Sequence, residues 1–225
     1  MPTISEMNDS LISLLSLTSP PVAVTFAADE PTPTTDVSPE PAGCCFWAPA
    51  QHTRLNTVRE DHANCSVGSY THGFIPLEQA AAGADTAALL ASGWVGEADL
   101  MGAAALPFTP AQVTYEPLSQ AKSPDVVLVR LAPTSLMTLS GAVPELRLVA
   151  KPQCVIVPLA YSGDVAVSPG CAVSRTRTDL PADELTCAIP AGALDSIVGR
   201  LQRSTAADRA VSEFAAADMA ANFGR

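Results

Sequence analysis

The chain has 225 residues, of which 48% are hydrophobic and 16% are charged, a composition typical of one well-buried globular domain. Its 12 basic and 23 acidic residues give a formal net charge of −11, which repels phosphate backbones and anionic membrane surfaces and argues against nucleic acid as a partner. No apolar run approaches the ~20 residues of a membrane helix, and the first residues, with Glu6 and Asp9, lack the cationic start of a secretory signal. We therefore predict a cytoplasmic protein with no membrane partner.

The N-terminal half of the chain predicts helices, one strand and a long loop. Ser5 is expected to cap a helix over 6–17, whose apolar residues are spaced to form one stripe. Residues 22–26 predict a short strand, and the tract rich in proline and threonine over 31–41 predicts an irregular loop. The alanine-rich stretch 77–91 favours a helix.

The C-terminal half mixes strands and helices without a regular alternation. The predicted elements are strands over 126–131, 165–168 and 185–189, an apolar run over 155–160, and helices over 133–141, 191–203 and 206–222. This order favours the α+β class, with a single domain over 1–225 built on a mixed sheet flanked by helices. The last helix, 205–225, is the one segment expected to be loosely attached.

Six cysteines are the clearest functional signal in the chain: Cys44, Cys45, Cys65, Cys154, Cys171 and Cys187. In a cytoplasmic protein, so many cysteines indicate metal ligands or buried thiols rather than a disulfide framework. The common catalytic signatures, a phosphate-binding loop, a zinc-binding His-Glu-x-x-His helix and a Gly-x-Ser-x-Gly elbow, are missing from the sequence. Residues 43–74 instead concentrate three of the cysteines and all three histidines, a density that indicates a site rather than a plain core.

Three segments carry a resemblance to a known family. They are DHANCSVGSYTHGF over 61–74, PDVVLVRLAP over 124–133 and PGCAVSRTRTDLPADEL over 169–185, and a Cys-Phe-Trp segment begins at Cys45. Together and in this order they resemble the prokaryotic domain-of-unknown-function family one-six-nine, over roughly residues 20–201. The resemblance implies a shared fold and site but no reaction. It places Cys45, Cys65, Cys154 and Cys171 at matching positions, and it leaves Cys44 and Cys187 as extras.

The leading hypothesis is a 4Fe–4S cluster held by four thiolates, since soft ligands from separated segments suit such a cluster. The expected ligands are Cys45, Cys65, Cys154 and Cys171. If only three of them bind, the fourth iron is open to act as a Lewis acid on a small-molecule substrate. Arg175 or Arg177 would then hold an anionic substrate, and His62 would move a proton.

Other interpretations of the same residues remain open. A zinc ion held by Cys65, His62 and one or two further cysteines would have a structural or sensing role. Two of the cysteines could instead form a reversible disulfide in a thiol redox protein, with one accessible thiol of low pKa. Without any metal, the chain could be a small-molecule binding module whose cysteines fill gaps in the core. Neither the reaction nor the oligomeric state follows from the sequence.

Overall fold

The computed structural model describes residues 2–29, 40–178 and 180–224, so most of the predicted loop 31–41 lies outside the described residues. A seven-stranded sheet in the order β2-β3-β1-β4-β7-β6-β5 forms the centre of the fold. All neighbouring strands are antiparallel except β5 and β6, which are parallel, so the sheet is mixed. The strands are β1 (Val22–Ala27), β2 (Leu55–Thr57), β3 (Gln112–Pro117), β4 (Val126–Leu131), β5 (Arg147–Leu148), β6 (Ala166–Ser168) and β7 (Leu185–Pro190). The predicted α+β class is confirmed.

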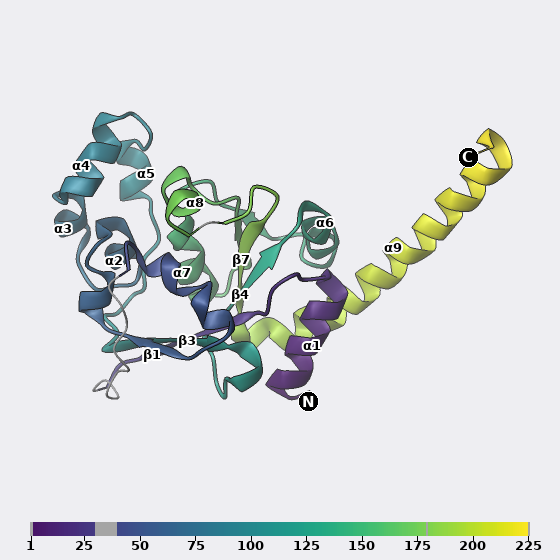
Figure 1. Ribbon diagram of the computed structural model, residues 1–225, viewed down its shortest axis with the longest axis horizontal. Coiled ribbons are helices and arrows are strands. Elements are labelled where there is room, and N and C mark those ends of the chain that lie inside the picture. Colours follow the sequence, from purple (N-terminus) through teal and green to yellow (C-terminus); the bar gives the residue numbers. More distant parts are fainter. Residues whose placement is uncertain (1, 30–39, 179, 225) are drawn as a thin grey trace.

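The sheet is buried on both faces, as its central strand β4 shows. Val127, Val129 and Leu131 point into one hydrophobic cluster, whereas Val126 and Leu128 point into the other, because successive side chains of a strand alternate between faces. Helices α1 (Ile4–Leu15), α6 (Pro133–Ala142) and the start of α9 (Leu194–Phe223) cover the first face, and α7 (Ile156–Tyr161) contacts β4, β6 and β7 on the second (Figure 1).

The predicted strands 22–26, 126–131, 165–168 and 185–189 are confirmed within one residue, but several helix predictions are corrected. Thr3, not Ser5, caps α1, and it forms a reciprocal capping box with Glu6. The apolar run 155–160 forms helix α7. The predicted helices 191–203 and 206–222 join into one helix, α9, because no glycine or proline interrupts residues 200–222.

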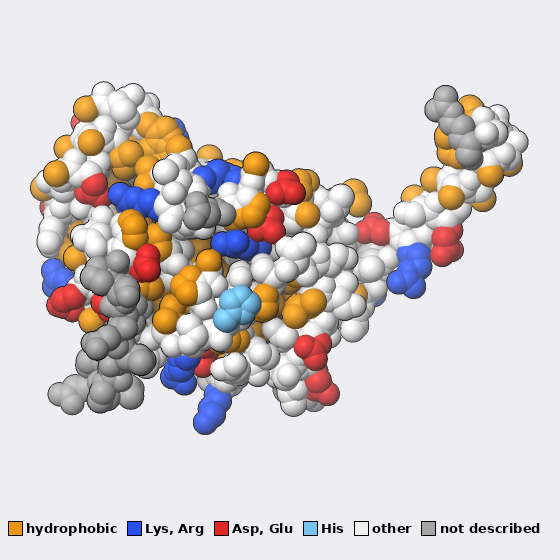
Figure 2. Space-filling view, in the orientation of Figure 1, with side chains coloured by type: hydrophobic (Ala, Val, Ile, Leu, Met, Phe, Trp, Pro, Cys, Tyr) orange, Lys and Arg blue, Asp and Glu red, His pale blue; other side chains and the backbone are white. Residues whose placement is uncertain are grey.

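Helix α9 is anchored at one end only. Its first two turns bury Leu194, Ile197, Val198 and Leu201, and its remaining turns extend away from the body of the molecule (Figure 1). Val211, Phe214 and Phe223 on this projecting part are between 65% and 72% exposed, and apolar side chains are visible along it in Figure 2. Among the described residues, no helix combines the length and the apolar character needed to cross a membrane.

A small group of helices lies beyond one end of the sheet, and we call the three helices over residues 77–101 the cap. The cap consists of α3 (Leu77–Ala81), α4 (Ala84–Ala91) and α5 (Glu97–Met101), so the predicted helix 77–91 is divided near Gly83. It packs on α2 (Ser66–Thr71) (Figure 1). Leu100 of the cap packs in a small cluster with Val67 of α2 and Cys154, which is separate from the two clusters that flank the sheet.

Candidate functional site

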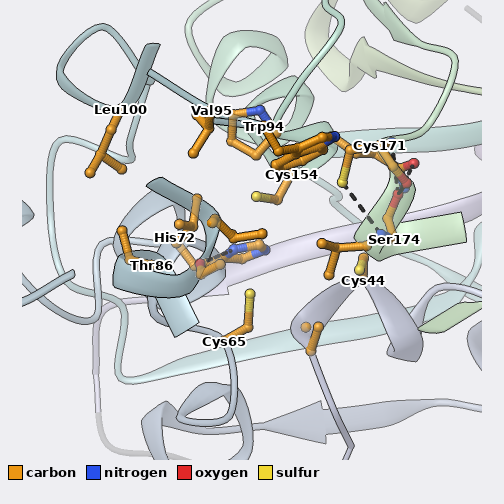
Figure 3. A pocket seen from close by; sticks show the side chains of 18 residues that line it. Cys44, Cys65, His72, Thr86, Trp94, Val95, Leu100, Cys154, Cys171 and Ser174 are labelled. Carbon is orange, nitrogen blue, oxygen red and sulfur yellow. Dashed lines mark hydrogen bonds between the residues drawn. The ribbon is translucent and has the colours of Figure 1, made fainter. Parts of the chain in front are cut away.

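Four cysteine side chains from four separate segments line one cavity of about 60 Å³ between the cap and the sheet (Figure 3). Cys44 lies in the 3₁₀ turn η1 (Gly43–Phe46), and Cys65 immediately precedes α2. Cys154 lies in the 3₁₀ turn η5 (Gln153–Val155), and Cys171 immediately precedes α8 (Ala172–Thr178). Each thiol thus stands at the start of a helical turn, where backbone N–H groups have no partner inside the turn.

Backbone N–H groups already donate to two of these sulfurs. The N–H of Ser174 lies 3.3 Å from Cys171 Sγ. Burial raises the pKa of Cys65, and a hydrogen bond from the N–H of Gly68 to Cys65 Sγ offsets part of that increase. Gly68 is suited to this position because a Cβ there would lie only 3.3 Å from Cys65 Sγ. Such hydrogen bonds stabilise thiolates, and they are among the interactions that tune sulfur-ligated clusters.

In the protein without a metal, the cavity favours neutral thiols. Burial raises the pKa of Cys154 and of Cys65. A side-chain hydrogen bond with Cys45 and burial together raise the pKa of Cys44. Any metal that binds these sulfurs must therefore displace their protons, so its affinity increases with pH.

The structure brings Cys65, Cys154 and Cys171 together as the sequence suggested, but the fourth thiol in the cavity is Cys44 and not the predicted Cys45. Cys45 Sγ points toward the carbonyl oxygen of Arg177, at 3.5 Å. The two neighbours diverge because consecutive side chains in a 3₁₀ turn point about 120° apart. Hydrogen bonds to Cys45 from the side chain of Cys44 and from the backbone of Ala42 lower the pKa of this thiol to about 7.

His62 lies behind the cavity wall and does not line it. Thr57 Oγ1 donates its only proton to the carbonyl oxygen of Val113, at 2.9 Å, so His62 Nε2–H donates to Thr57 Oγ1, also at 2.9 Å. Nδ1 of His62 is buried without a hydrogen-bond partner and faces Gly43. Burial holds the pKa of His62 well below its ordinary value, so the ring is neutral. The predicted proton carrier therefore packs against Gly43 and Phe46 of the turn that carries Cys44, and its ring does not enter the cavity.

Gly43 is tightly constrained by this histidine. A Cβ at residue 43 would lie 2.5 Å from His62 Nδ1 and 2.9 Å from Cε1. We expect Gly43→Ala to lower the free energy of unfolding by about 1–3 kcal/mol, because the turn that carries Cys44 must shift. Urea unfolding measures the loss, and Gly192→Ala is the matched control because a Cβ there meets no atom within 4 Å. Equal stability of the two variants would contradict this packing.

His72 and Tyr115 are part of the site, although the sequence did not single them out. His72 lines the cavity. Its Nδ1–H donates to the carbonyl oxygen of Gly68 at 2.9 Å, and its Nε2 accepts the hydroxyl proton of Tyr115 at 3.1 Å. Burial lowers the pKa of His72 to about 4. Both ring nitrogens are thus occupied, and the neutral ring joins α2 to strand β3.

Arg175, predicted to hold an anionic substrate, instead organises the loop that carries Cys171. Its guanidinium donates to backbone carbonyl oxygens on both sides of that loop, namely those of Pro169, Leu180, Pro181 and Glu184. Arg177 donates to the carbonyl oxygen of Pro41 at 3.0 Å. Neither arginine lines the thiol cavity. Their hydrogen bonds position backbone, and Arg177 links this loop to the segment before Cys44.

The side of the cavity formed by the cap is largely apolar. Its lining includes Leu89, Trp94, Val95 and Leu100 of the cap together with Val67. Trp94, Val95 and Leu100 are labelled in Figure 3. Lys151 supports the wall from outside: its Nζ donates to the carbonyl oxygen of Trp94 and lies 5.0 Å from the centroid of the indole ring. Among the described residues, no Asp, Glu, Lys or Arg side chain lines the cavity.

Cys44, Cys65, Cys154 and Cys171 do not form a preformed site for a single metal ion. Two sulfurs bonded to one zinc lie at most about 4.6 Å apart, because each Zn–S bond is ~2.3 Å long. Across residues 2–29, 40–178 and 180–224, no three His, Cys, Asp or Glu side chains meet closely enough to hold one ion. All six cysteines are free.

Comparison with known proteins identifies a family but no function. A family model described as "Uncharacterised ArCR", a domain of unknown function, matches residues 10–200. This match confirms the resemblance seen in the sequence. No curated protein and no solved structure matches the chain.

Proposed function

The chain belongs to the uncharacterised family DUF169, and from its cavity of thiols we propose that it is a 4Fe–4S cluster protein whose ligands are Cys44, Cys65, Cys154 and Cys171. The observation that carries the proposal is the convergence of these four cysteines, distant in sequence, on one cavity. Cysteines that merely fill core gaps have no reason to share a cavity wall, as fully buried Cys187 in β7 illustrates.

The donor set fits an iron-sulfur cluster better than it fits zinc. In a cubane each thiolate binds its own iron, so the sulfurs can lie farther apart than the ligands of a single ion. The described residues contain no preformed group for a metal ion, so this preference rests on the cysteine donors alone. The apolar surroundings and the N–H groups of Gly68 and Ser174 suit clustered thiolates, which need charge stabilisation without access to water.

Each residue of the site has a role in this proposal. The four cysteines hold the cluster, which when bound supplies electron transfer, or Lewis acidity if one iron lacks a protein ligand. Gly68 and Ser174 donate to the sulfurs. Arg175 fixes the loop before α8, so it positions Cys171 instead of binding substrate. His62 and His72 stay neutral and hold the turns that carry Cys44 and Cys65.

The cellular setting is part of the same proposal. We propose that the protein works in the reducing cytoplasm, where six free cysteines persist as thiols. The net charge of −11 argues against nucleic acid or anionic membrane as a partner. A small molecule that reaches the thiol cavity is the expected partner.

One observation favours a second candidate function, thiol redox chemistry. The pKa of Cys45 is lowered to about 7, so a large part of this thiol is ionised at neutral pH. Its neighbour Cys44 shares a side-chain hydrogen bond with it. A redox role requires a reversible disulfide between two of the cysteines and no bound metal.

Metal and acid-labile sulfide analysis of protein purified without oxygen tests the proposal. We expect iron and sulfide at about four each per chain, with the broad visible absorption of a cubane. Cys154→Ala should lose the iron, whereas Cys187→Ala should keep it, although both cysteines are buried and have raised pKa values. Colourless wild-type protein, or retained iron in Cys154→Ala, would overturn the assignment, and a reversible disulfide in the colourless protein would favour the redox function.

A further inference from the structure

One polar group in the cavity wall has no structural partner. Thr86 lies in α4, is fully buried and lines the thiol cavity. Its hydroxyl Oγ1 forms no hydrogen bond with any described residue. Threonine hydroxyls in helices usually donate to a carbonyl one turn earlier, which makes this exception informative. In Figure 3, Thr86 lies across the cavity from Cys171.

An unpaired buried hydroxyl destabilises the folded protein, and a valine of nearly the same shape would avoid that cost. The neighbouring side chains of the wall are apolar: Leu89, Trp94, Val95 and Leu100. Thr86 therefore adds a hydroxyl to a wall whose other side chains, apart from the indole N–H of Trp94, are hydrocarbon. Binding sites for small molecules combine apolar walls with few polar groups in this way.

The charge of the cavity limits what it can bind. No charged side chain of the described residues lines it. The cations near the cavity have other partners: Arg175 donates to the carbonyl oxygens of its own loop, Arg177 to that of Pro41, and Lys151 to that of Trp94. An anionic ligand would lose its hydration without gaining a countercharge, so the cavity disfavours it.

The size of the cavity points to a small ligand. Its volume of about 60 Å³ exceeds the ~10–15 Å³ that one water requires. This volume is too small for the eight atoms of a cubane and a ligand together, so a ligand binds beside a cluster only if the cap moves outward. The buried cluster that joins the cap to the body, in which Leu100 meets Val67 and Cys154, is separate from the two clusters that flank the sheet, so an outward movement of the cap leaves the core of the sheet intact.

We propose that this cavity binds a small, uncharged, largely apolar molecule, whose one polar atom accepts a hydrogen bond from Thr86 Oγ1 and whose apolar part lies against Trp94 and Leu89. This inference names the class of ligand that the proposed cluster site takes, and what the ligand is used for depends on that proposed function. Binding itself depends only on the wall, so it can be tested with and without a cluster.

Two three-carbon probes that differ in charge test the proposal. Propionitrile is uncharged and has one hydrogen-bond acceptor, whereas propionate is an anion at pH 7. We expect propionitrile to change the tryptophan fluorescence in a saturable manner and propionate to have no effect at equal concentration. Trp94→Phe should abolish the signal, because Trp47, the other tryptophan, does not line this cavity. A signal that persists in Trp94→Phe would place the binding elsewhere and overturn the proposal.

Variants of the wall separate binding from folding. Thr86→Val should weaken propionitrile binding between about twofold and tenfold, the range of one hydrogen bond, while the protein remains at least as stable as wild type. Thr176→Val, at an exposed position of α8, is the matched control and should bind normally. Leu89→Lys should weaken propionitrile binding and create binding of propionate, whereas Leu148→Lys, outside the cavity and 70% exposed, should do neither.

The outcomes distinguish this inference from the cluster proposal. Selective binding of propionitrile to colourless, metal-free protein would support the ligand class and count against the cluster. Iron-loaded protein that binds propionate as well as propionitrile, or that binds propionitrile unchanged in Thr86→Val, would overturn the ligand class and leave the cluster intact. The absence of saturable binding in both forms of the protein would also overturn it.

Discussion

Cys44→Ala should abolish iron binding, whereas Cys45→Ala should leave the iron content close to that of wild type. The two residues are adjacent, but only Cys44 lines the cavity with Cys65, Cys154 and Cys171. Cys45 Sγ points toward the carbonyl oxygen of Arg177. A cubane with three protein ligands is less firmly held than one with four. We therefore expect at least a tenfold loss of retained iron in Cys44→Ala, because removing groups around a metal typically lowers metal affinity ~10–100-fold.

Iron and sulfide should be measured in both variants after the same anaerobic purification and again after gel filtration. Urea unfolding of the metal-free proteins shows whether either alanine damages the turn η1, and both should stay folded because alanine removes one buried sulfur. If only Cys45→Ala lost its iron, the ligand would be Cys45, as the family resemblance implied. Equal retention in both variants would show that the thiols of this turn do not bind iron.

The metal-free protein should lose several kcal/mol of stability between pH 6.5 and about 4, because two histidines are buried in the neutral form. The pKa of His72 is lowered by burial from 6.5 to about 4, and that of His62 is lowered well below 6.5. As the pH falls through this window, the unfolded chain gains protons that the folded protein cannot take up. The free energy of unfolding therefore declines with falling pH, by about 3 kcal/mol from His72 alone.

Urea unfolding of metal-free protein at several pH values between 7 and 4.5 measures this effect. In His72→Gln the decline should be shallower, because one of the two titrating rings is gone while an amide can still donate to Gly68. His52→Gln, at an exposed position, is the control for a change of histidine without a change in the core. A profile of His72→Gln as steep as that of wild type would show that His72 is not buried as a neutral ring.

Local sequence patterns were sufficient for much of the sheet. The valine-rich segment 126–131 is strand β4, and residues 22–26 lie in β1, because runs of β-branched residues favour strands wherever they are buried. Strand β3 was not predicted, although Val113 and Tyr115 alternate with polar Gln112 and Thr114. The apolar run at 155–160 carries no periodicity that distinguishes a strand from a buried helix, and its contacts with the sheet decide for helix.

The chemistry of the candidate site was partly visible in the same way. The family resemblance marked Cys65, Cys154 and Cys171 as members of one site, and the structure brings them together. Tyr115 and Thr86 gave no signal, and His72 counted only as one of the three histidines in residues 43–74. The burial of these side chains depends on residues far away in the chain. The exposed face of α9 is a similar case, since the sequence shows its apolar residues but not that they lack contacts.

The sequence by itself determined the α+β class, the membership in an uncharacterised family and the presence of free cysteines in excess of what a core needs. These properties follow from composition, local propensity and motifs that lie within single segments. Only the tertiary structure decided that Cys44 rather than Cys45 faces the cavity, that Arg175 binds backbone rather than an anion, and that Thr86 is left without a partner. Side-chain direction in a tight turn and the desolvation of a polar group depend on the packing of distant segments, which no local pattern of residues contains.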